Sequence, residues 1–134
     1  MLVASEDKQL KIKIQLLVVQ VSKIPWSQTE EKIAKQAFQT AYQRETSTLI
    51  ANVRERAGSI TELEDLWYLH DLLSTKRYEI DGKYDYDAAT VVFDFAKLIK
   101  EGWLSLDDLQ GLNPEILSKI SALLRMQMLS LIHI

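Results

Sequence analysis

The sequence predicts an all-α protein: an elongated hairpin of two long helices followed by a small C-terminal helical head. Only four glycines and two prolines occur in 134 residues, so few residues interrupt helices. Apolar residues recur at steps of three and four over most of the chain, which is the period of an amphipathic helix. The Ser-x-x-Glu spacing that is typical of helix starts precedes both of the longest such patterns.

Residues 1–24 do not share this pattern. From Lys11 to Ile14 the side chains alternate between charged and β-branched, as in a strand. No partner strand follows, and a lone strand is not stable. We interpret residues 1–24 as a flexible or loosely docked N-terminal extension; a helical segment and an artefact of start-site choice are the alternatives.

The first long helix is expected to begin at Ser27 and to end at Gly58. Ser27 and Glu30 have the spacing of a capping box, in which the hydroxyl and the carboxylate accept hydrogen bonds from the free amides of the first turn. Gly58 is expected at the C′ position just past the helix. The apolar face of this helix comprises Ile33, Ala34, Ala37, Phe38, Ala41, Tyr42, Leu49 and Val53.

The length of this helix predicts a second chain. About 30 residues span about 45 Å, whereas a compact domain of this size has a radius of gyration of about 14 Å. Part of the apolar face would stay uncovered in a monomer, so we expect a homodimer, with Leu49, Ile50 and Trp67 at the interface. Residues 25–134 then form one helical domain, in which residues 25–84 are dimerisation helices and residues 85–134 are the head.

The second long helix is expected directly after Gly58. Ser59 and Glu62 repeat the capping-box spacing, which leaves almost no loop. A glycine inside a helix costs about 1 kcal/mol, but the apolar stripe continues past Gly82, so we expect the helix to pass through it. The residues of this stripe are Ile60, Leu63, Leu66, Trp67, His70, Leu73, Arg77, Ile80 and Tyr84.

The head is expected to contain three shorter helices. Asp85 or Asp87 caps the first helix, which ends at Gly102. A short helix follows over residues 105–111, and the Asn-Pro-Glu sequence at 113–115 begins the last one. The apolar tail after it either packs or frays. The expected core of the head comprises Val91, Val92, Phe95, Leu98, Ile99, Ile116, Leu117, Ile120, Leu123 and Leu124.

One face of the second helix is rich in large aromatic and polar side chains. Trp and Arg are residue types that anchor protein interfaces, although Trp67 is equally a candidate core aromatic. Asp71 and Arg77 are six residues apart, so an ion pair between them would suit two chains better than one. We expect this face to bind a protein partner or a small ligand. Residues three or four apart lie on one face of a helix, and the residues that share this face are Trp67, His70, Asp71, Ser74, Arg77 and Tyr78.

The same face does not predict catalysis. His70 and Asp71 are adjacent, which sets them about 100° apart on a helix, so they are not a preset acid–base dyad. Ser74 lies one turn from His70, but nothing marks an oxyanion hole or an orienting group. With no cysteine and two histidines in the chain, we expect no thiol chemistry, no metal site and no cofactor.

The composition argues against nucleic acids and membranes as partners. With 16 basic against 19 acidic residues and a net charge of −3, the chain has no electrostatic footprint for nucleic acid or an anionic membrane. The longest apolar run, residues 16–19, is far shorter than the roughly 20 residues that span a bilayer. The acidic N-terminus is unlike a signal peptide, and the lack of cysteine fits a reducing compartment. We therefore expect a cytoplasmic protein without membrane insertion.

Several longer stretches carry a family resemblance. They are Pro25-Trp26-Ser27-Gln28, Ala41-Tyr42-Gln43-Arg44-Glu45, the run from Asp65 to Asp71, the run from Lys76 to Asp85, and Glu101-Gly102. These stretches resemble the fluorescence recovery protein family of cyanobacteria, the regulators of the photoactive orange carotenoid protein. The resemblance covers residues from about 25 to 125, so residues 1–24 and the tail after Met126 inherit no role from it.

The resemblance implies an all-helical homodimer without catalysis. Such a protein binds the light-activated red carotenoid protein, chiefly through its C-terminal domain, speeds its return to the orange form and helps it leave the phycobilisome. It would act in the cytoplasm near phycobilisomes at the thylakoid surface. The functional positions that carry over are Trp67, His70, Asp71 and Arg77, with Phe93 and Lys119 in the head. Ile50 matches a dimer-interface position usually held by Leu.

Two alternatives to this function are open from the sequence. One is an unrelated dimeric helical adaptor, and the other is an enzyme that uses His70 and Asp71 on a small substrate. A dark-recovery assay with the photoactivated carotenoid protein distinguishes both from a recovery protein.

Overall fold

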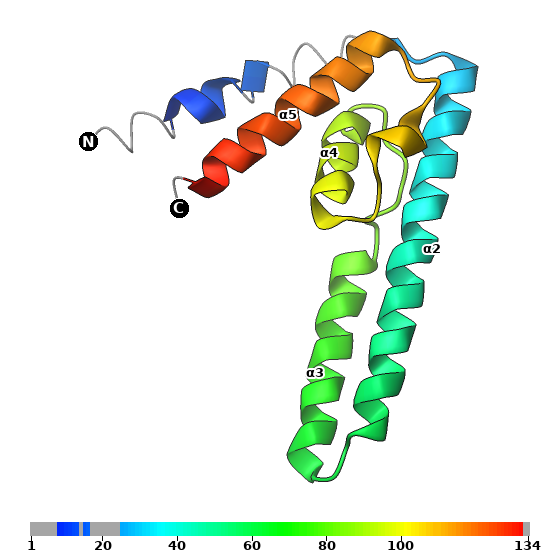
Figure 1. Ribbon diagram of the computed structural model, residues 1–134, viewed down its shortest axis with the longest axis vertical. Coiled ribbons are helices and arrows are strands. Elements are labelled where there is room, and N and C mark those ends of the chain that lie inside the picture. The colour runs from blue at the N-terminus through cyan, green and yellow to red at the C-terminus, as the bar shows by residue number, and fades with distance from the viewer. Residues whose placement is uncertain (1–7, 14, 17–24, 133–134) are drawn as a thin grey trace. The chain divides into compact units, whose positions relative to one another are not determined.

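The computed structural model describes residues 8–13, 15–16 and 25–132, and of residues 127–132 only the backbone. Every regular element among these residues is helical (Figure 1). The elements are α2 (Gln28–Gly58), α3 (Leu63–Ile80), α4 (Val91–Glu101), the 3-10 helix η1 (Leu106–Leu109) and α5 (Pro114–Ile132). The expected all-α class, with a hairpin of two long helices and smaller helices after it, is confirmed for the single chain.

Part of the N-terminal extension is helical. Residues 8–13 and 15–16 have helical backbone, so Lys11, Ile12 and Lys13 do not form the strand that their alternation suggested. These residues agree with the helical alternative. The rest of residues 1–24 lies outside the described residues, and the flexible extension stays a prediction.

The chain divides into two compact units, which are described separately below. Residues 38–85 form the hairpin unit, and residues up to 37 together with residues 86–134 form the head unit. The division at 37/38 falls inside α2.

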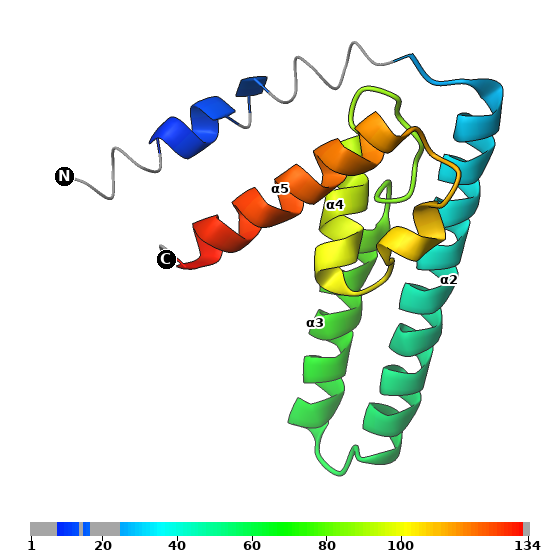
Figure 2. The same ribbon diagram turned by 45° about the horizontal axis from the view of Figure 1, so that its top comes forward.

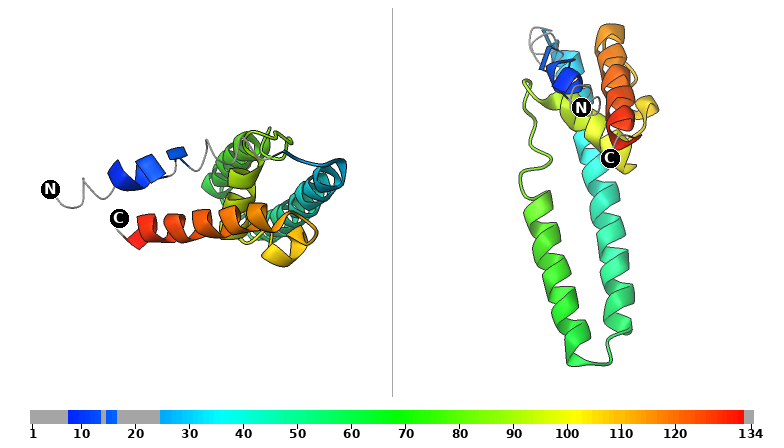
Figure 3. Two further views of the ribbon diagram at one scale, coloured as in Figure 1. Left: turned by 90° about the horizontal axis from the view of Figure 1, so that it is seen from above. Right: turned by 90° about the vertical axis from the view of Figure 1, so that its left-hand side faces the viewer.

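In the hairpin unit, α3 runs antiparallel beside the C-terminal part of α2 (Figures 2 and 3). α2 ends at Gly58 as expected, but Gly58 is the last helical residue rather than a left-handed C′ residue, because its φ is not positive. The Ser59 hydroxyl instead donates to the Glu55 carbonyl oxygen at 3.2 Å and satisfies one free acceptor of the last turn.

The capping box predicted at Ser59 and Glu62 is wrong. α3 begins at Leu63 with Glu62 as its N-cap, and the box is formed by Glu62 and Asp65. The Asp65 carboxylate accepts hydrogen bonds from the backbone amides of Thr61 and Glu62, both at 3.2 Å, and these bonds lower the pKa of Asp65. Asp65, three residues after Glu62, thus accepts the Glu62 amide that the sequence motif had assigned to the Ser59 hydroxyl.

The predicted passage of this helix through Gly82 is also wrong. α3 ends at Ile80, and Gly82 has a φ of 77°, a left-handed conformation that glycine adopts without the usual penalty. The Lys83 amide donates to the Ile80 carbonyl oxygen at 3.1 Å and closes the turn. The chain therefore reverses out of the helix at Gly82.

In the head unit, α4 and α5 pack on each other (Figure 1). The Ser27–Glu30 capping box is confirmed, with the Glu30 amide donating to the Ser27 hydroxyl at 3.1 Å and the Ser27 amide donating to Glu30 at 3.3 Å. The other Glu30 oxygen accepts the Asn113 amide at 3.1 Å and so ties the start of α2 to the start of α5. The buried apolar residues of this unit are Ala34, Ala37, Val91, Val92, Phe95, Ala96, Leu98, Leu104, Leu109, Leu112, Ile116, Ile120 and Leu123.

The head helices begin and end close to the expected residues. α4 ends at Gly102 in the left-handed conformation, as expected. Its N-cap is Thr90 rather than Asp85 or Asp87. Asp87 acts one turn earlier, where its side chain accepts the Ala89 amide at 2.9 Å. The caps of η1 at Ser105 and of α5 at residues 113–115 agree with the sequence motifs.

Candidate functional site

α3 has one half-buried side and one exposed side. At about 100° per residue, its half-buried residues Leu69, Leu72, Lys76 and Ile80 fall within an arc of about 80°. This arc faces α2, because the Lys76 charge acts on Glu45 of that helix. No residue of α3 is fully buried, which is unusual for a helix carrying so many apolar side chains.

The aromatic and polar residues predicted to share a face do so on the opposite side of α3. We call this surface the outer face. Its two large aromatic side chains are well exposed, Trp67 at 56% and Tyr78 at 86%. Within an arc of about 120°, all exposed to solvent, the outer face comprises Trp67, His70, Asp71, Ser74, Arg77 and Tyr78.

Three of these side chains contact each other. The Trp67 and His70 rings meet edge to face with centroids 6.4 Å apart. His70 Nδ1 lies 3.3 Å from Asp71 Oδ1, so the two side chains reach each other although their helix positions diverge. The side chains of His70 and Asp71 are 71% and 82% exposed, so water screens the pair. Among the described residues no hydroxyl group forms a hydrogen bond with His70, so the outer face contains no Ser–His contact of the kind that activates a nucleophile.

Arg77 has a weak partner within its own helix. Its Nε lies 4.0 Å from Asp81 Oδ2, and both side chains are more than three-quarters exposed, at 85% and 76%. Exposed pairs of this kind contribute about 0–1 kcal/mol. Arg77 can therefore exchange this contact for a carboxylate on another protein at little cost.

The two head positions, Phe93 and Lys119, belong to the other compact unit. Phe93 is half-buried on α4, between the buried Val92 and the half-buried Asp94, and Lys119 is half-buried on α5 beside the buried Ile120. Burial raises the pKa of Asp94, and the nearby Asp87 adds to the increase. Neither position joins the outer face within one unit, so the sequence-derived site residues form two separate groups.

The hairpin unit also exposes many apolar side chains beyond the outer face. Of the two residues expected at a dimer interface with Trp67, Leu49 is half-buried and Ile50 is 56% exposed. Apolar patches of this extent are typical of protein interaction sites. The exposed large apolar residues of this unit are Tyr42, Ile50, Leu63, Leu66, Trp67, Tyr68, Leu73 and Tyr78.

The hairpin unit contains a buried carboxylate with two hydrogen-bond donors, which was not predicted from the sequence. Lys83 Nζ donates to Glu45 Oε1 at 2.8 Å, and the Tyr84 hydroxyl donates to the same oxygen. The Lys83 and Glu45 side chains are only 12% and 8% exposed, and the Tyr84 ring meets Tyr42 edge to face. We call Glu45, Lys83 and Tyr84 the Glu45 clasp. It ties the turn after α3 to α2 and so fixes where the outer face ends.

The electrostatics of the clasp favour a charged Glu45. Burial alone would raise the pKa of Glu45, but hydrogen bonds from Lys83 and Tyr84 and the charges of Lys83 and Lys76 outweigh it and lower the pKa. The sequence contains the two opposite charges, Glu45 and Lys83. Because they are 38 residues apart in the chain, helix periodicity cannot show that they form a pair.

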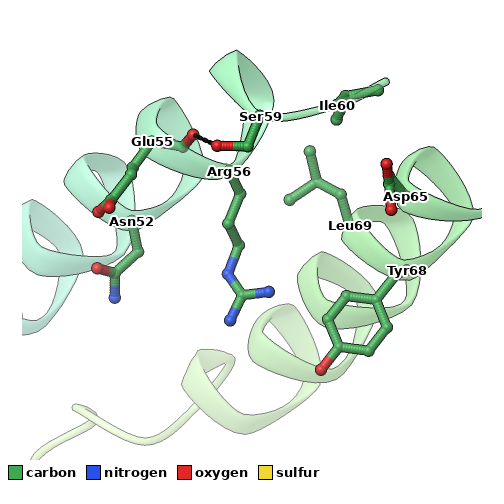
Figure 4. Close-up of a pocket in the computed structure, with 8 residues that line it drawn as sticks. All are labelled: Asn52, Glu55, Arg56, Ser59, Ile60, Asp65, Tyr68 and Leu69. Atoms are coloured by element: carbon green, nitrogen blue, oxygen red, sulfur yellow. Dashed lines mark hydrogen bonds between the residues drawn. The ribbon is translucent and has the colours of Figure 1, made fainter. Parts of the chain in front are cut away.

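A pocket lies at the closed end of the hairpin, on a different side of α3 (Figure 4). Its volume is about 460 Å³, and the Arg56 guanidinium lies 5.5 Å from the centre of the Tyr68 ring. Acidic and basic side chains both line the pocket. No histidine or cysteine lies among the lining residues, so the pocket has no evident reactive group. The lining residues are Asn52, Glu55, Arg56, Ser59, Ile60, Asp65, Tyr68 and Leu69.

Two kinds of feature are absent from the described part of the chain. No cluster of three histidine, cysteine or acidic side chains there could hold a metal ion. None of its helices is long and apolar enough to cross a membrane.

Comparison with known proteins identifies the family. Residues 26–124 match the family described as photoprotection regulator fluorescence recovery protein. The fluorescence recovery protein of Synechocystis sp. strain PCC 6803 is 47% identical over 109 residues, which cover 81% of this chain and 100% of that relative.

Solved structures agree with this relationship. The fluorescence recovery protein of Fremyella diplosiphon is 55% identical, with a TM-score of 0.72 over 75% of this chain and 99% of that one. The Synechocystis structure is 50% identical, with a TM-score of 0.73 over the same shares of the two chains. The alternative of an unrelated adaptor is therefore wrong, and the chain belongs to the fluorescence recovery protein family of photoprotection regulators.

Proposed function

We propose that this protein is a non-enzymatic regulator of the orange carotenoid protein. It binds the photoactivated red form, chiefly at its C-terminal domain, accelerates reversion to the orange form and promotes detachment from the phycobilisome, which restores antenna fluorescence. Action on the phycobilisome would place it in the cytoplasm near the thylakoid surface. The observation that carries the proposal is the outer face of α3, an exposed surface of interface-anchoring residues with no activated nucleophile.

The outer face supplies what such a regulator needs. Acceleration without bond chemistry requires tighter binding to the transition state of reversion than to the red form. Trp67 and Arg77 are the residue types that carry most of the binding energy at protein interfaces. Because both are exposed and only weakly held within the chain, they are available to a partner without rearrangement.

Preference for the red form follows from differential binding. A regulator shifts an equilibrium only if it binds the two states unequally. A partner surface that is hidden when the two carotenoid-protein domains close would be open only in the red form. Holding both domains on one regulator also raises their effective concentration for re-association.

We further propose that the working form is a homodimer built from the hairpin. Ile50 and Leu49 provide apolar contact area on α2, and Trp67 lies at the edge between the dimer contact and the partner contact. The exposure of Ile50 and Trp67, both at 56%, supports this assembly, because large apolar side chains exposed together mark interaction sites. Phe93 and Lys119 provide a second partner contact from the head.

Reversion kinetics test the function. The orange carotenoid protein is photoactivated, transferred to darkness, and followed by its visible absorbance with and without this protein. We expect the reversion rate to rise with the concentration of this protein and then to saturate. An unrelated helical protein at equal concentration is the control, and an unchanged rate with this protein would refute the proposal.

A further inference from the structure

Tyr78 is the most exposed of the large apolar side chains in the described part of the chain, at 86%. Its side chain makes no hydrogen bond or ring contact to any described residue. A buried tyrosine removes about 150–250 Å² from water, and burying apolar area contributes roughly 25 cal/mol per Å². Tyr78 contributes none of this to the fold of the single chain.

The position of Tyr78 connects it to the outer face rather than to the hairpin interior. Eleven residues after Trp67, it returns to within about 20° of the same direction on the helix. The half-buried arc that contains Lys76 lies on the opposite side. Two large aromatic side chains thus stand at the two ends of one exposed stripe, with Asp71 and Ser74 between them.

The charges around Tyr78 indicate the kind of surface that covers it. The side chains of Glu79 and Asp81 are 51% and 76% exposed, and Asp85 is exposed directly after the turn. The accessible cations are Lys76, which donates to Glu79 at 3.4 Å, and Arg77, because Lys83 is only 12% exposed and is paired with Glu45. Acidic groups therefore outnumber basic ones at this end of α3. A complementary surface would present an apolar pocket with basic side chains on its rim.

We propose that Tyr78 is a further partner-contact residue, whose ring enters an apolar, basic-rimmed pocket on the photoactivated partner protein. This inference rests on the proposed function and adds a second aromatic anchor about 16 Å along α3 from Trp67 at 1.5 Å per residue. The contact area then spans most of the outer face rather than only its Trp67 end.

Tyr68 provides a matched control on the same helix. It is also exposed, at 64%, but it points about 100° away from Trp67 and lies against Arg56 in the pocket of Figure 4. Removing this ring changes an exposed tyrosine of α3 without changing the outer face.

The experiment is the dark-reversion assay with Tyr78→Ala, Tyr78→Phe and Tyr68→Ala over a range of concentrations. Hot-spot truncations at interfaces weaken binding substantially, so Tyr78→Ala should raise the concentration that gives half-maximal acceleration about tenfold. Tyr78→Phe keeps the ring and should stay within about twofold of wild type, and so should Tyr68→Ala. Circular dichroism should show equal helicity, because alanine favours helix more than tyrosine does.

The outcomes separate this inference from the proposed function. If wild-type protein does not accelerate reversion, the proposed function fails. If wild type accelerates and Tyr78→Ala matches it, only the Tyr78 contact is refuted. Equal losses in Tyr78→Ala and Tyr68→Ala, or in Tyr78→Phe and Tyr78→Ala, would also overturn it. Monomers of Tyr78→Ala in light scattering would assign the residue to the contact between two copies of this chain instead.

Discussion

At the scale of single residues, Glu45 shows how the hairpin holds a buried charge. Its carboxylate accepts hydrogen bonds from Lys83 and Tyr84, both in the turn after α3. Removing one partner of a buried ion pair is costly, because the other charge remains without compensation. Glu45→Ala should therefore lower the free energy of unfolding by about 3 kcal/mol, measured by urea unfolding at a fixed protein concentration.

An exposed ion pair of the same hairpin is the control for this prediction. Lys76 and Glu79 lie 3.4 Å apart with side chains 38% and 51% exposed, so Glu79→Ala should cost less than about 1 kcal/mol. Equal losses for Glu45→Ala and Glu79→Ala would contradict the account of the clasp.

The clasp also predicts a pH dependence. The folded protein holds the pKa of Glu45 below its ordinary value of 4.5, so the unfolded chain binds more protons in acid and stability rises with pH there. The contribution of Glu45 is complete above pH 4.5 and is lost as the pH falls through its folded pKa. The stability difference between wild type and Glu45→Gln should therefore shrink below pH 4.5. A difference that stays constant from pH 7 to about pH 3 would refute a charged clasp.

The sequence predicted which side chains share a helix face, but it did not predict which of them contact each other. The spacing of Trp67, His70 and Arg77 placed them on one face because helix periodicity depends only on sequence separation. The contact between His70 and Asp71 was missed because helix periodicity gives the directions of the two Cβ atoms and not the rotamers that bring the side-chain ends together. The Glu45 clasp was missed because its residues come from two segments whose pairing depends on the tertiary fold.

At the scale of helices and turns, replacing Gly82 or Gly58 by alanine should change the stability of the protein in opposite directions. Gly82 has a φ of 77° with room for a Cβ, so the cost of Gly82→Ala is backbone strain, about 1–2 kcal/mol. Gly58 is helical with open space around its Cα, so Gly58→Ala should stabilise the protein by about 0.5 kcal/mol. Thermal or urea unfolding of both variants measures the two changes in the free energy of unfolding. A stabilising Gly82→Ala would contradict the left-handed conformation of Gly82 in this turn.

The same turn explains why the sequence misplaced the end of α3. The stripe from Ile80 to Tyr84 looked helical because Tyr84 is indeed half-buried in the hairpin unit. Tyr84 reaches Tyr42 and Glu45 from a turn rather than from a helix. Periodicity reports which residues are covered, and it cannot separate a continued helix from a turn that returns the chain to the same side.

The start of α2 was predicted correctly, whereas the start of α3 was placed too early. Ser27 and Glu30 form the expected box. Near Ser59, the Asp65 side chain takes the amides of Thr61 and Glu62, so the helix begins later. Choosing between such alternatives requires the geometry of the loop, which sequence spacing does not contain.

At the scale of the whole molecule, the hairpin should assemble into a dimer through a contact that includes Ile50. Ile50→Glu places a charge where we propose that two copies meet, and burying an unpaired charge is strongly unfavourable. Light scattering should then give the mass of a monomer, whereas the wild type should give that of a dimer. Leu106→Glu, a similar change at a 42% exposed residue of the head, should leave the dimer intact. A dimeric Ile50→Glu would remove Ile50 from the interface.

The central claim is that the outer face accelerates reversion by binding, with Arg77 as one of its anchors. The most direct measurement is the dark-reversion rate of the photoactivated orange carotenoid protein with wild type, Arg77→Leu and Arg56→Leu, all verified as dimers. Arg56→Leu makes the same chemical change beside Tyr68, away from the outer face. We expect Arg77→Leu to abolish the acceleration and Arg56→Leu to preserve it. Full acceleration by Arg77→Leu, or loss with both variants, would contradict the claim.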